Sequence, residues 1–227
     1  MIAPLICAVL CLFLLVATLV CSAVGFDPGR YACKPLASLC FILVAVTGGA
    51  LVGDGPEYGR IITLGLVLGA VGDVALMLAG RKAFLTGLVA FLLGHVAYIV
   101  AFAAVTPIGT WFGPPALVPM GAAAIVLFWL WPHLDGSGRG MRVPVLCYVL
   151  VITVMVVAAL AVLGDSDRSH LSDRRAALAC IGALLFFASD LAVARQRFVT
   201  ESLGNRLWGL PAYYLGQLFL AFSALPD

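Results

Sequence analysis

Two aspartates, Asp73 and Asp190, each lie inside a long run of apolar residues. A charged carboxylate is costly in such surroundings, and intramembrane carboxylates usually face the interior of a helix bundle and mark function. Two carboxyl groups in one site can divide the work of acid–base catalysis, because one can keep its proton while the other stays ionised. This division suits cleavage of an acetal or a vinyl ether, which passes through an oxocarbenium ion as in glycoside hydrolysis.

Further polar residues accompany the two aspartates. Phe91, His95 and Tyr98 recur at spacings of four and three, which places them on one face of a helix. Tyr213 and Gln217 are four residues apart and share the face of another helix. A single histidine on an apolar face fits hydrogen-bonded packing as well as ligand binding. We predict that six residues bind substrate beside the aspartates: Lys34, His95, Tyr98, Tyr213, Tyr214 and Gln217.

Other kinds of chemistry find little support in the sequence. A catalytic zinc takes about three His, Asp or Glu ligands and an open position. Asp73, His95 and Asp190 could supply such a set, but with a single intramembrane histidine we expect no metal and no other cofactor. The chain has no G-x-S-x-G elbow, which disfavours a serine esterase, and it has no phosphate-binding or dinucleotide-binding loop.

The composition indicates which elements must position these residues. Of the 227 residues, 63% are hydrophobic and 11% are charged, and the net charge is +2. A soluble domain carries roughly 25% charged residues, so the sequence predicts an integral membrane protein and excludes a soluble enzyme, a disordered chain and a disulfide scaffold. The small net charge, without a basic cluster, excludes a nucleic-acid partner.

Eight apolar runs have the length of about 20 residues that a helix needs to cross a membrane. They predict an all-α fold, a polytopic transmembrane bundle that forms one domain over residues 1–227. The first run lacks the basic start and the cleavage site of a signal peptide, so we expect it to be retained. The runs lie near residues 2–24, 34–52, 59–79, 84–105, 116–131, 143–163, 175–194 and 207–225.

Basic residues in the short connections predict the orientation, since they accumulate on the cytoplasmic side. The connections after odd-numbered spans hold nine (Arg30, Lys34, Arg81, Lys82, Arg139, Arg142, Arg195, Arg197 and Arg206), and the others hold four (Arg60, Arg168, Arg174 and Arg175). We therefore expect both termini outside, in an inner or plasma membrane. Lys34, Asp73, Asp190, Tyr213 and Gln217 then fall in the cytoplasmic half, which indicates one site that opens to the cytoplasm.

Five motifs occur in a fixed order: Lys34-Pro35, Gly72-Asp73 with Leu76, Phe84-x₂-Gly87-x₃-Phe91-x₃-His95-x₂-Tyr98, Ser189-Asp190, and Tyr213-Tyr214-Leu215-Gly216-Gln217. Together they resemble the YhhN-like, lysoplasmalogenase family of eight-span membrane proteins, over about Lys34 to Gln217. One departure is Gly69, where many members of the family are expected to carry serine. The resemblance implies hydrolysis of the vinyl ether of a lysoplasmalogen to a fatty aldehyde and a glycerophospho-choline or -ethanolamine.

The same resemblance implies catalytic roles for Asp73 and Asp190, with either one as the acid, and a lysophospholipid and membrane lipids as partners. It leaves open another lyso-ether lipid as substrate, and it implies no oligomeric state. Two other classes remain as alternatives. A small-solute or lipid transporter or channel predicts polar residues at several depths. A non-catalytic membrane module, whose polar residues only join helices, predicts that Asp73→Asn leaves fold and phenotype intact.

Overall fold

The computed structural model describes residues 2–52, 56–134, 140–165 and 171–227, and within these ranges the chain is helical and forms no strand. The long helices are α1 (Ile2–Val24), α2 (Asp27–Thr47), α3 (Pro56–Met77), α4 (Arg81–Ala103), α5 (Leu117–Leu130), α6 (Arg142–Gly164), α7 (Asp173–Ala194) and α8 (Leu203–Ser223). Short 3₁₀ turns cover Ile108–Thr110, Pro114–Ala116 and Trp131–His133, and a π turn covers Arg195–Val199. The expected all-α polytopic bundle is confirmed.

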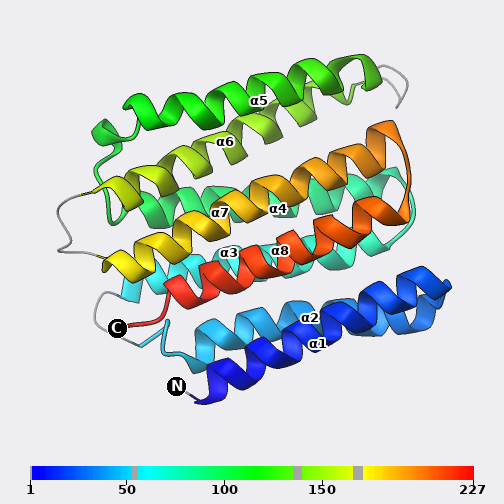
Figure 1. Cartoon of the computed structure of the whole chain (residues 1–227), viewed down its shortest axis with the longest axis horizontal. Helices are drawn as coiled ribbons and strands as arrows, with labels where there is room; N and C mark the ends of the chain where they lie inside the picture. The colour runs from blue at the N-terminus through cyan, green and yellow to red at the C-terminus, as the bar shows by residue number, and fades with distance from the viewer. Residues whose placement is uncertain (1, 53–55, 135–139, 166–170) are drawn as a thin grey trace.

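Each long helix runs antiparallel to the long helix before it in the sequence, as Figure 1 shows. Helices α7 and α8 lie in front of α3 and α4 in this view, and these four stand between the α1–α2 pair on one side and the α5–α6 pair on the other. The α1–α2, α3–α4 and α7–α8 connections meet at one end, on the right in Figure 1. We call it the basic end, because it carries Arg30, Arg81, Lys82, Arg195, Arg197 and Arg206. Arg139 and Arg168 lie outside the described residues.

Seven helical segments in the described ranges are long and apolar enough to cross a membrane: Ile2–Val24, Asp27–Thr47, Glu57–Met77, Arg81–Ala103, Pro114–His133, Arg142–Gly164 and Asp173–Val199. Helix α8 is not among them, although it has 21 residues. It carries Asn205, Arg206 and Gln217, which lower its hydropathy. Because α8 packs along α7 inside the bundle, we propose that it forms the eighth span.

The second span begins earlier than the sequence predicted. Helix α2 begins at Asp27, with Pro28 in its first turn, rather than at Lys34. Pro28 suits a helix start because its fixed φ is already helical and its missing N–H would have no partner there. Pro35 gives the same signal, but it lies inside α2. The consequence for function is that Lys34 is an interior residue of a helix and not a residue of a loop.

Glycines bring α7 and α8 into backbone contact. A Cβ atom on Gly182 of α7 would lie 2.9 Å from the carbonyl oxygen of Gly216 in α8, and a Cβ on Gly216 would lie 3.0 Å from the carbonyl oxygen of Gly182. Small residues at such positions are what allows membrane helices to approach closely. The tight α7–α8 contact fixes Asp190 on α7 relative to Tyr213 on α8.

We therefore expect Gly182→Ala to separate the two helices and to lower the free energy of unfolding by about 1–3 kcal/mol, as overpacking does. The measurement is thermal unfolding in detergent. The matched control is Gly121→Ala in α5, where an added Cβ meets nothing within 4 Å, so that the better helix propensity of alanine is neutral or stabilising. Equal melting temperatures for the two variants would contradict this account of the α7–α8 contact.

Candidate active site

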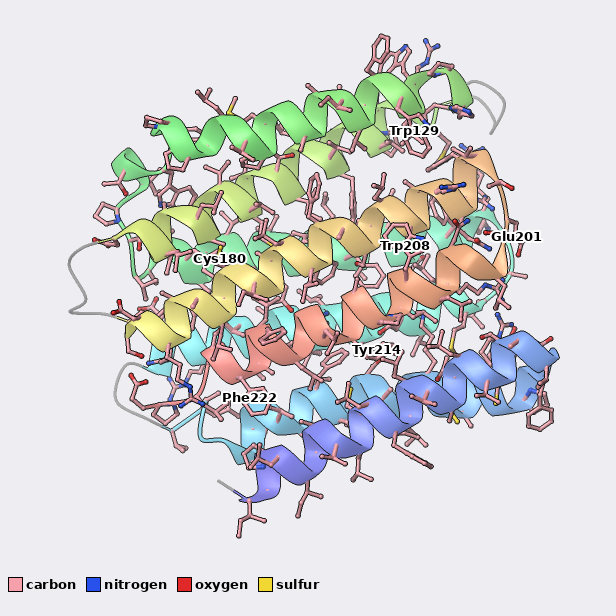
Figure 2. All side chains as sticks on the ribbon, in the orientation of Figure 1. Trp129, Cys180, Glu201, Trp208, Tyr214 and Phe222 are labelled. Carbon is pink, nitrogen blue, oxygen red and sulfur yellow. The ribbon has the colours of Figure 1, made fainter. Side chains whose placement is uncertain are left out.

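A cavity of about 630 Å³ extends from the basic end into the bundle, a size typical of small-molecule sites. Leu78–Gly80 after α3 and Gln196–Phe198 after α7 lie at its mouth, together with Glu201, which Figure 2 shows at this end. Asp73 and Asp190 both line its wall, although they come from α3 and α7. The structure thus brings the two predicted carboxyl groups to one cavity.

Asp73 is held by a cation and a hydroxyl from α2. The Lys34 Nζ lies 3.0 Å from the Asp73 Oδ1 and donates to the Asp73 carbonyl oxygen at 3.4 Å. The Ser38 Oγ donates to the Asp73 Oδ2 at 2.6 Å. Both carboxylate oxygens therefore have a partner, and the side chain is only 3% exposed. These contacts suit an ionised carboxylate in a fixed position, because bonds to a charged acceptor are the strong ones.

Tyr214 of α8 supports this group from behind. Its hydroxyl donates to the Lys34 carbonyl oxygen at 3.0 Å and lies 3.2 Å from the Ser38 Oγ. Figure 2 shows Tyr214 about halfway along α8, on the side that faces the α1–α2 pair. The ring is fully buried and packs against Phe41 of α2. Tyr214 therefore fixes the position of α2 and its two polar side chains, and it does not line the cavity.

Asp190 has different surroundings. The Tyr148 hydroxyl of α6 donates to the Asp190 Oδ2 at 2.8 Å, and the His95 Nε2 of α4 lies 3.7 Å from the same oxygen. No Lys or Arg ammonium or guanidinium forms an ion pair with Asp190 in the described part of the chain. Its side chain is 17% exposed, more than that of Asp73. Asp190 is thus the more accessible carboxyl group and the one without a permanent cation.

His95 is fully buried, and neither ring nitrogen has a hydrogen-bond partner among the described residues. Its ring packs edge-to-face against Phe186 and Tyr148, with centroid distances of 4.5 and 5.3 Å. His95 is not among the residues that line the cavity. The imidazole therefore packs beside the Asp190 carboxyl group, on the side away from the cavity, and it does not contact substrate.

A chain of hydrogen bonds positions Tyr213 on the cavity wall. The Tyr98 hydroxyl donates to the Gln217 Oε1 at 2.7 Å, and the Gln217 Nε2 donates to the Tyr213 hydroxyl at 3.1 Å. Gly69, the departure from the family pattern, lies beside these hydrogen-bonded side chains, because a Cβ on Gly69 would collide with the Gln217 amide nitrogen. A serine at residue 69 would require Gln217 to move. Gly69 thus leaves the space that the amide occupies.

The predicted site residues divide into two groups. Lys34, Asp73, Asp190 and Tyr213 line the cavity. The other four (His95, Tyr98, Tyr214 and Gln217) are fully buried behind its wall. Sequence reasoning missed Ser38 and Tyr148, which bond directly to the two carboxyl groups. A signal existed for Ser38, because it follows Lys34 by one helical turn. Among the described residues, no three His, Cys, Asp or Glu side chains are grouped as a metal site would require.

Fold and site together define a polytopic helical membrane protein with a largely apolar cavity between its helices, into which two aspartates project. The YhhN family model matches residues 29–224, and the chain belongs to this family of multi-pass membrane proteins. The curated relatives that it resembles include lysoplasmalogenase TMEM86A of Bos taurus. That protein is 30% identical over 197 residues, which cover 85% of this chain and 76% of the relative. No solved structure matches the chain.

Proposed function

We propose that this protein is a membrane-embedded ether hydrolase that cleaves the vinyl ether of lysoplasmalogens. The products are a fatty aldehyde and a glycerophospho-choline or -ethanolamine. One observation carries the proposal: a single cavity holds the carboxyl groups of two membrane-embedded aspartates, of which Asp73 pairs with a cation and Asp190 pairs with no Lys or Arg among the described residues. Membership of the YhhN family and the likeness to a protein named lysoplasmalogenase support it.

The difference in surroundings supports the following division of roles between the two aspartates. Asp190, without a permanent cation, acts as the acid and gives its proton to the vinyl carbon that is not bonded to oxygen. The electron pair of the double bond forms the new C–H bond, and the carbon beside the ether oxygen becomes an oxocarbenium ion. Asp73, which is paired with the Lys34 ammonium and bonded to the Ser38 hydroxyl, stabilises this cation across the cavity. Electrostatic stabilisation of this kind is strong because the donors and charges are already in place.

Water completes the reaction. Asp73 orients a water molecule onto the cationic carbon, and the Asp190 carboxylate takes the proton that this water loses, which regenerates the acid. The hemiacetal then collapses: the bond between its carbon and the glycerol oxygen breaks, the hemiacetal hydroxyl becomes the aldehyde carbonyl, and its proton passes to the glycerol oxygen. One water is consumed and one aldehyde is released for each vinyl ether, so no cofactor enters the balance.

The apolar side of the cavity suits the hydrocarbon chain of such a substrate. Beyond Asp190 the lining comes from α5, α6 and α7 and is aliphatic or aromatic: Val126, Leu130, Val145, Val149, Ile152 and Phe187. Val145, Val149 and Ile152 follow one face of α6, the face that also presents Tyr148. We infer that the alkenyl chain lies along this face with its vinyl ether at Asp190.

On this basis Val149→Trp is expected to lower kcat/KM for long alkenyl chains by about tenfold relative to short ones, because a hydrophobic pocket discriminates by this order when its length changes. The measurement is aldehyde release from a series of chain lengths. Leu150→Trp is the matched control, since Leu150 is the next residue and is exposed on the outer face of α6. An equal loss at every chain length would contradict the inferred position of the chain.

The cavity opens at the basic end, which holds most of the described lysines and arginines. Because basic connections accumulate in the cytoplasm, we propose that substrate enters from the cytoplasmic leaflet of an inner or plasma membrane and that both termini lie outside. Cysteine-accessibility labelling of Arg81→Cys and of Arg174→Cys, near opposite ends of the bundle, tests the orientation.

The proposed activity is tested by incubating detergent-purified protein with lysoplasmenylethanolamine and measuring the aldehyde released, with and without EDTA. We expect aldehyde in both samples. If folded protein releases no aldehyde from this lipid or from other lyso-ether lipids, the proposal is wrong, and solute flux into proteoliposomes becomes the next assay. Loss of activity with EDTA would contradict the metal-free mechanism and would indicate that a metal ion takes part in the reaction.

A further inference from the structure

Arginines surround the mouth of the cavity. Arg30 of α2, Arg197 of the π turn and Arg206 of α8 all contribute to its lining, and Lys34 lies further in. A cavity that presents several cations to its entrance is suited to an anion. We propose that Arg30 binds the phosphate group of the lysophospholipid and so sets which lipids the site accepts, an inference that rests on the proposed hydrolase function.

Lys34, which the sequence predicted to bind substrate, is not available to bind the phosphate. Its ammonium group lies 3.0 Å from the Asp73 Oδ1 and 3.4 Å from the Asp73 carbonyl oxygen, and its side chain is 12% exposed. Moving Lys34 to a phosphate would leave the buried Asp73 carboxylate without a counter-charge, which is strongly unfavourable. The phosphate therefore requires another cation near the aspartate.

Arg30 has the right position and free hydrogen-bonding capacity. It precedes Lys34 by four residues, so the two side chains leave the same face of α2 about one turn apart. One terminal nitrogen pairs with the Asp27 Oδ1 at 2.8 Å, but the Asp27 side chain is 66% exposed, and such pairs contribute little. The Arg30 Nε is buried and has no hydrogen-bond partner in the part of the chain that the structure describes. A guanidinium group offers five donors in a planar fork that matches phosphate.

The other two arginines of the mouth make contacts of the same two kinds as Arg30, which pairs with the exposed Asp27 and whose guanidinium lies 5.2 Å from the centroid of the Tyr31 ring. The Arg206 guanidinium pairs with Glu201 at 3.1 Å, within the α7–α8 connection and α8. The Arg197 guanidinium lies over the Phe84 ring, 4.6 Å from its centroid. Neither has a buried nitrogen without a partner. They add positive charge to the mouth, whereas Arg30 is the one of the three that has a buried nitrogen without a hydrogen-bond partner among the described residues, and it lies one turn before Lys34, the partner of Asp73.

This position fits the dimensions of the substrate. In a lysoplasmalogen only the glycerol unit separates the phosphate from the vinyl ether, a distance on the order of one helical turn. With the phosphate at Arg30, the ether oxygen reaches the space between Asp73 and Asp190. The alkenyl chain then continues toward α5 and α6, where the lining is apolar. The substrate thus crosses the cavity from the α1–α2 side to the α5–α6 side.

The test compares lysoplasmenylethanolamine with alkenylglycerol, which has the same vinyl ether but no phosphate. For Arg30→Gln we expect KM for the phospholipid to rise about tenfold, from the loss of charge-assisted bonds, with kcat within twofold of wild type. Hydrolysis of alkenylglycerol stays unchanged, and Arg30→Lys restores part of the phospholipid KM. Arg195→Gln is the matched control, since Arg195 is an exposed arginine at the same end that does not line the cavity.

Two results would overturn the inference: an equal change for both substrates in Arg30→Gln, or the same rise in KM for Arg195→Gln, which would indicate general attraction to the lipid surface.

A binding assay separates this inference from the proposed function. Thermal stabilisation by alkyl-lysophosphatidylethanolamine, a saturated ether, is compared with stabilisation by alkylglycerol. If wild type releases no aldehyde but the phosphate-containing ether stabilises it in an Arg30-dependent way, the phosphate site holds and the hydrolase proposal fails. Without any preference for the phosphate-containing ether, the site is refuted.

Discussion

Replacing Asp190 by asparagine is expected to lower kcat for aldehyde release by about 10²- to 10⁴-fold, the usual contribution of a positioned general acid. An amide has nearly the shape of a carboxyl group, and its oxygen can still accept the hydrogen bond from the Tyr148 hydroxyl. It has no acidic proton to give to the vinyl carbon. The variant therefore removes the chemistry and keeps the packing, so kcat should fall while the melting temperature stays within a few degrees.

Tyr148→Phe is the companion variant, because Tyr148 contacts the carboxyl group and is not proposed to exchange a proton with substrate. Removing its hydroxyl leaves the acid in place but less well oriented, and we expect a loss of about tenfold, since small misplacements of a catalytic group have effects of this size or larger. Full activity of Asp190→Asn in folded protein would refute the assigned acid. If Asp190→Asn were fully active and Asp73→Asn inactive, Asp73 would be assigned as the acid instead of Asp190.

Much of this site could be predicted from the sequence, because a carboxylate in an apolar run is rare and has few structural uses. Asp73 and Asp190 stood out by residue type, and the basic connections placed both near one end of the bundle. Helical spacing correctly put His95 and Tyr98 on the inner face of α4. It could not give their depth, and the structure shows both fully buried behind the cavity wall.

Ser38 and Tyr148 could not be identified in the same way. A hydroxyl in a membrane helix commonly bonds to a carbonyl of its own helix, as Thr18 and Thr63 do here. The Ser38 hydroxyl also reaches such a carbonyl, that of Lys34 at 3.1 Å, but α3 brings the Asp73 Oδ2 closer, at 2.6 Å, and that is a property of packing between helices. Tyr148 gains its role in the same manner, from the approach of α7 to α6.

The helix boundaries show a second limit of sequence reasoning. Two prolines, Pro28 and Pro35, each give the signal of a helix start, and the local sequence does not decide between them. The structure begins α2 at the first. This shift turns Lys34 from an expected residue at the start of a span into the buried partner of Asp73.

The Lys34–Asp73 pair gives the second prediction with a large expected effect. Lys34→Met leaves the Asp73 carboxylate buried without its cation, and Asp73→Asn leaves the Lys34 ammonium without its anion. Breaking a buried pair from one side lowers the free energy of unfolding by about 3–5 kcal/mol. We expect the double variant Lys34→Met/Asp73→Asn to recover most of this loss, because no uncompensated charge remains. Unfolding in detergent measures all four proteins.

Activity should not follow stability in this cycle. Because the mechanism requires an ionised carboxylate opposite the developing oxocarbenium ion, the double variant should fold as well as wild type and yet release aldehyde at least about a hundredfold more slowly, as loss of one preorganised electrostatic group predicts. A stable and active double variant would reduce the pair to a structural contact and would favour the non-catalytic role of Asp73. A stable and inactive one separates charge balance from catalysis, since the same two side chains would then be dispensable for the fold and required for the reaction.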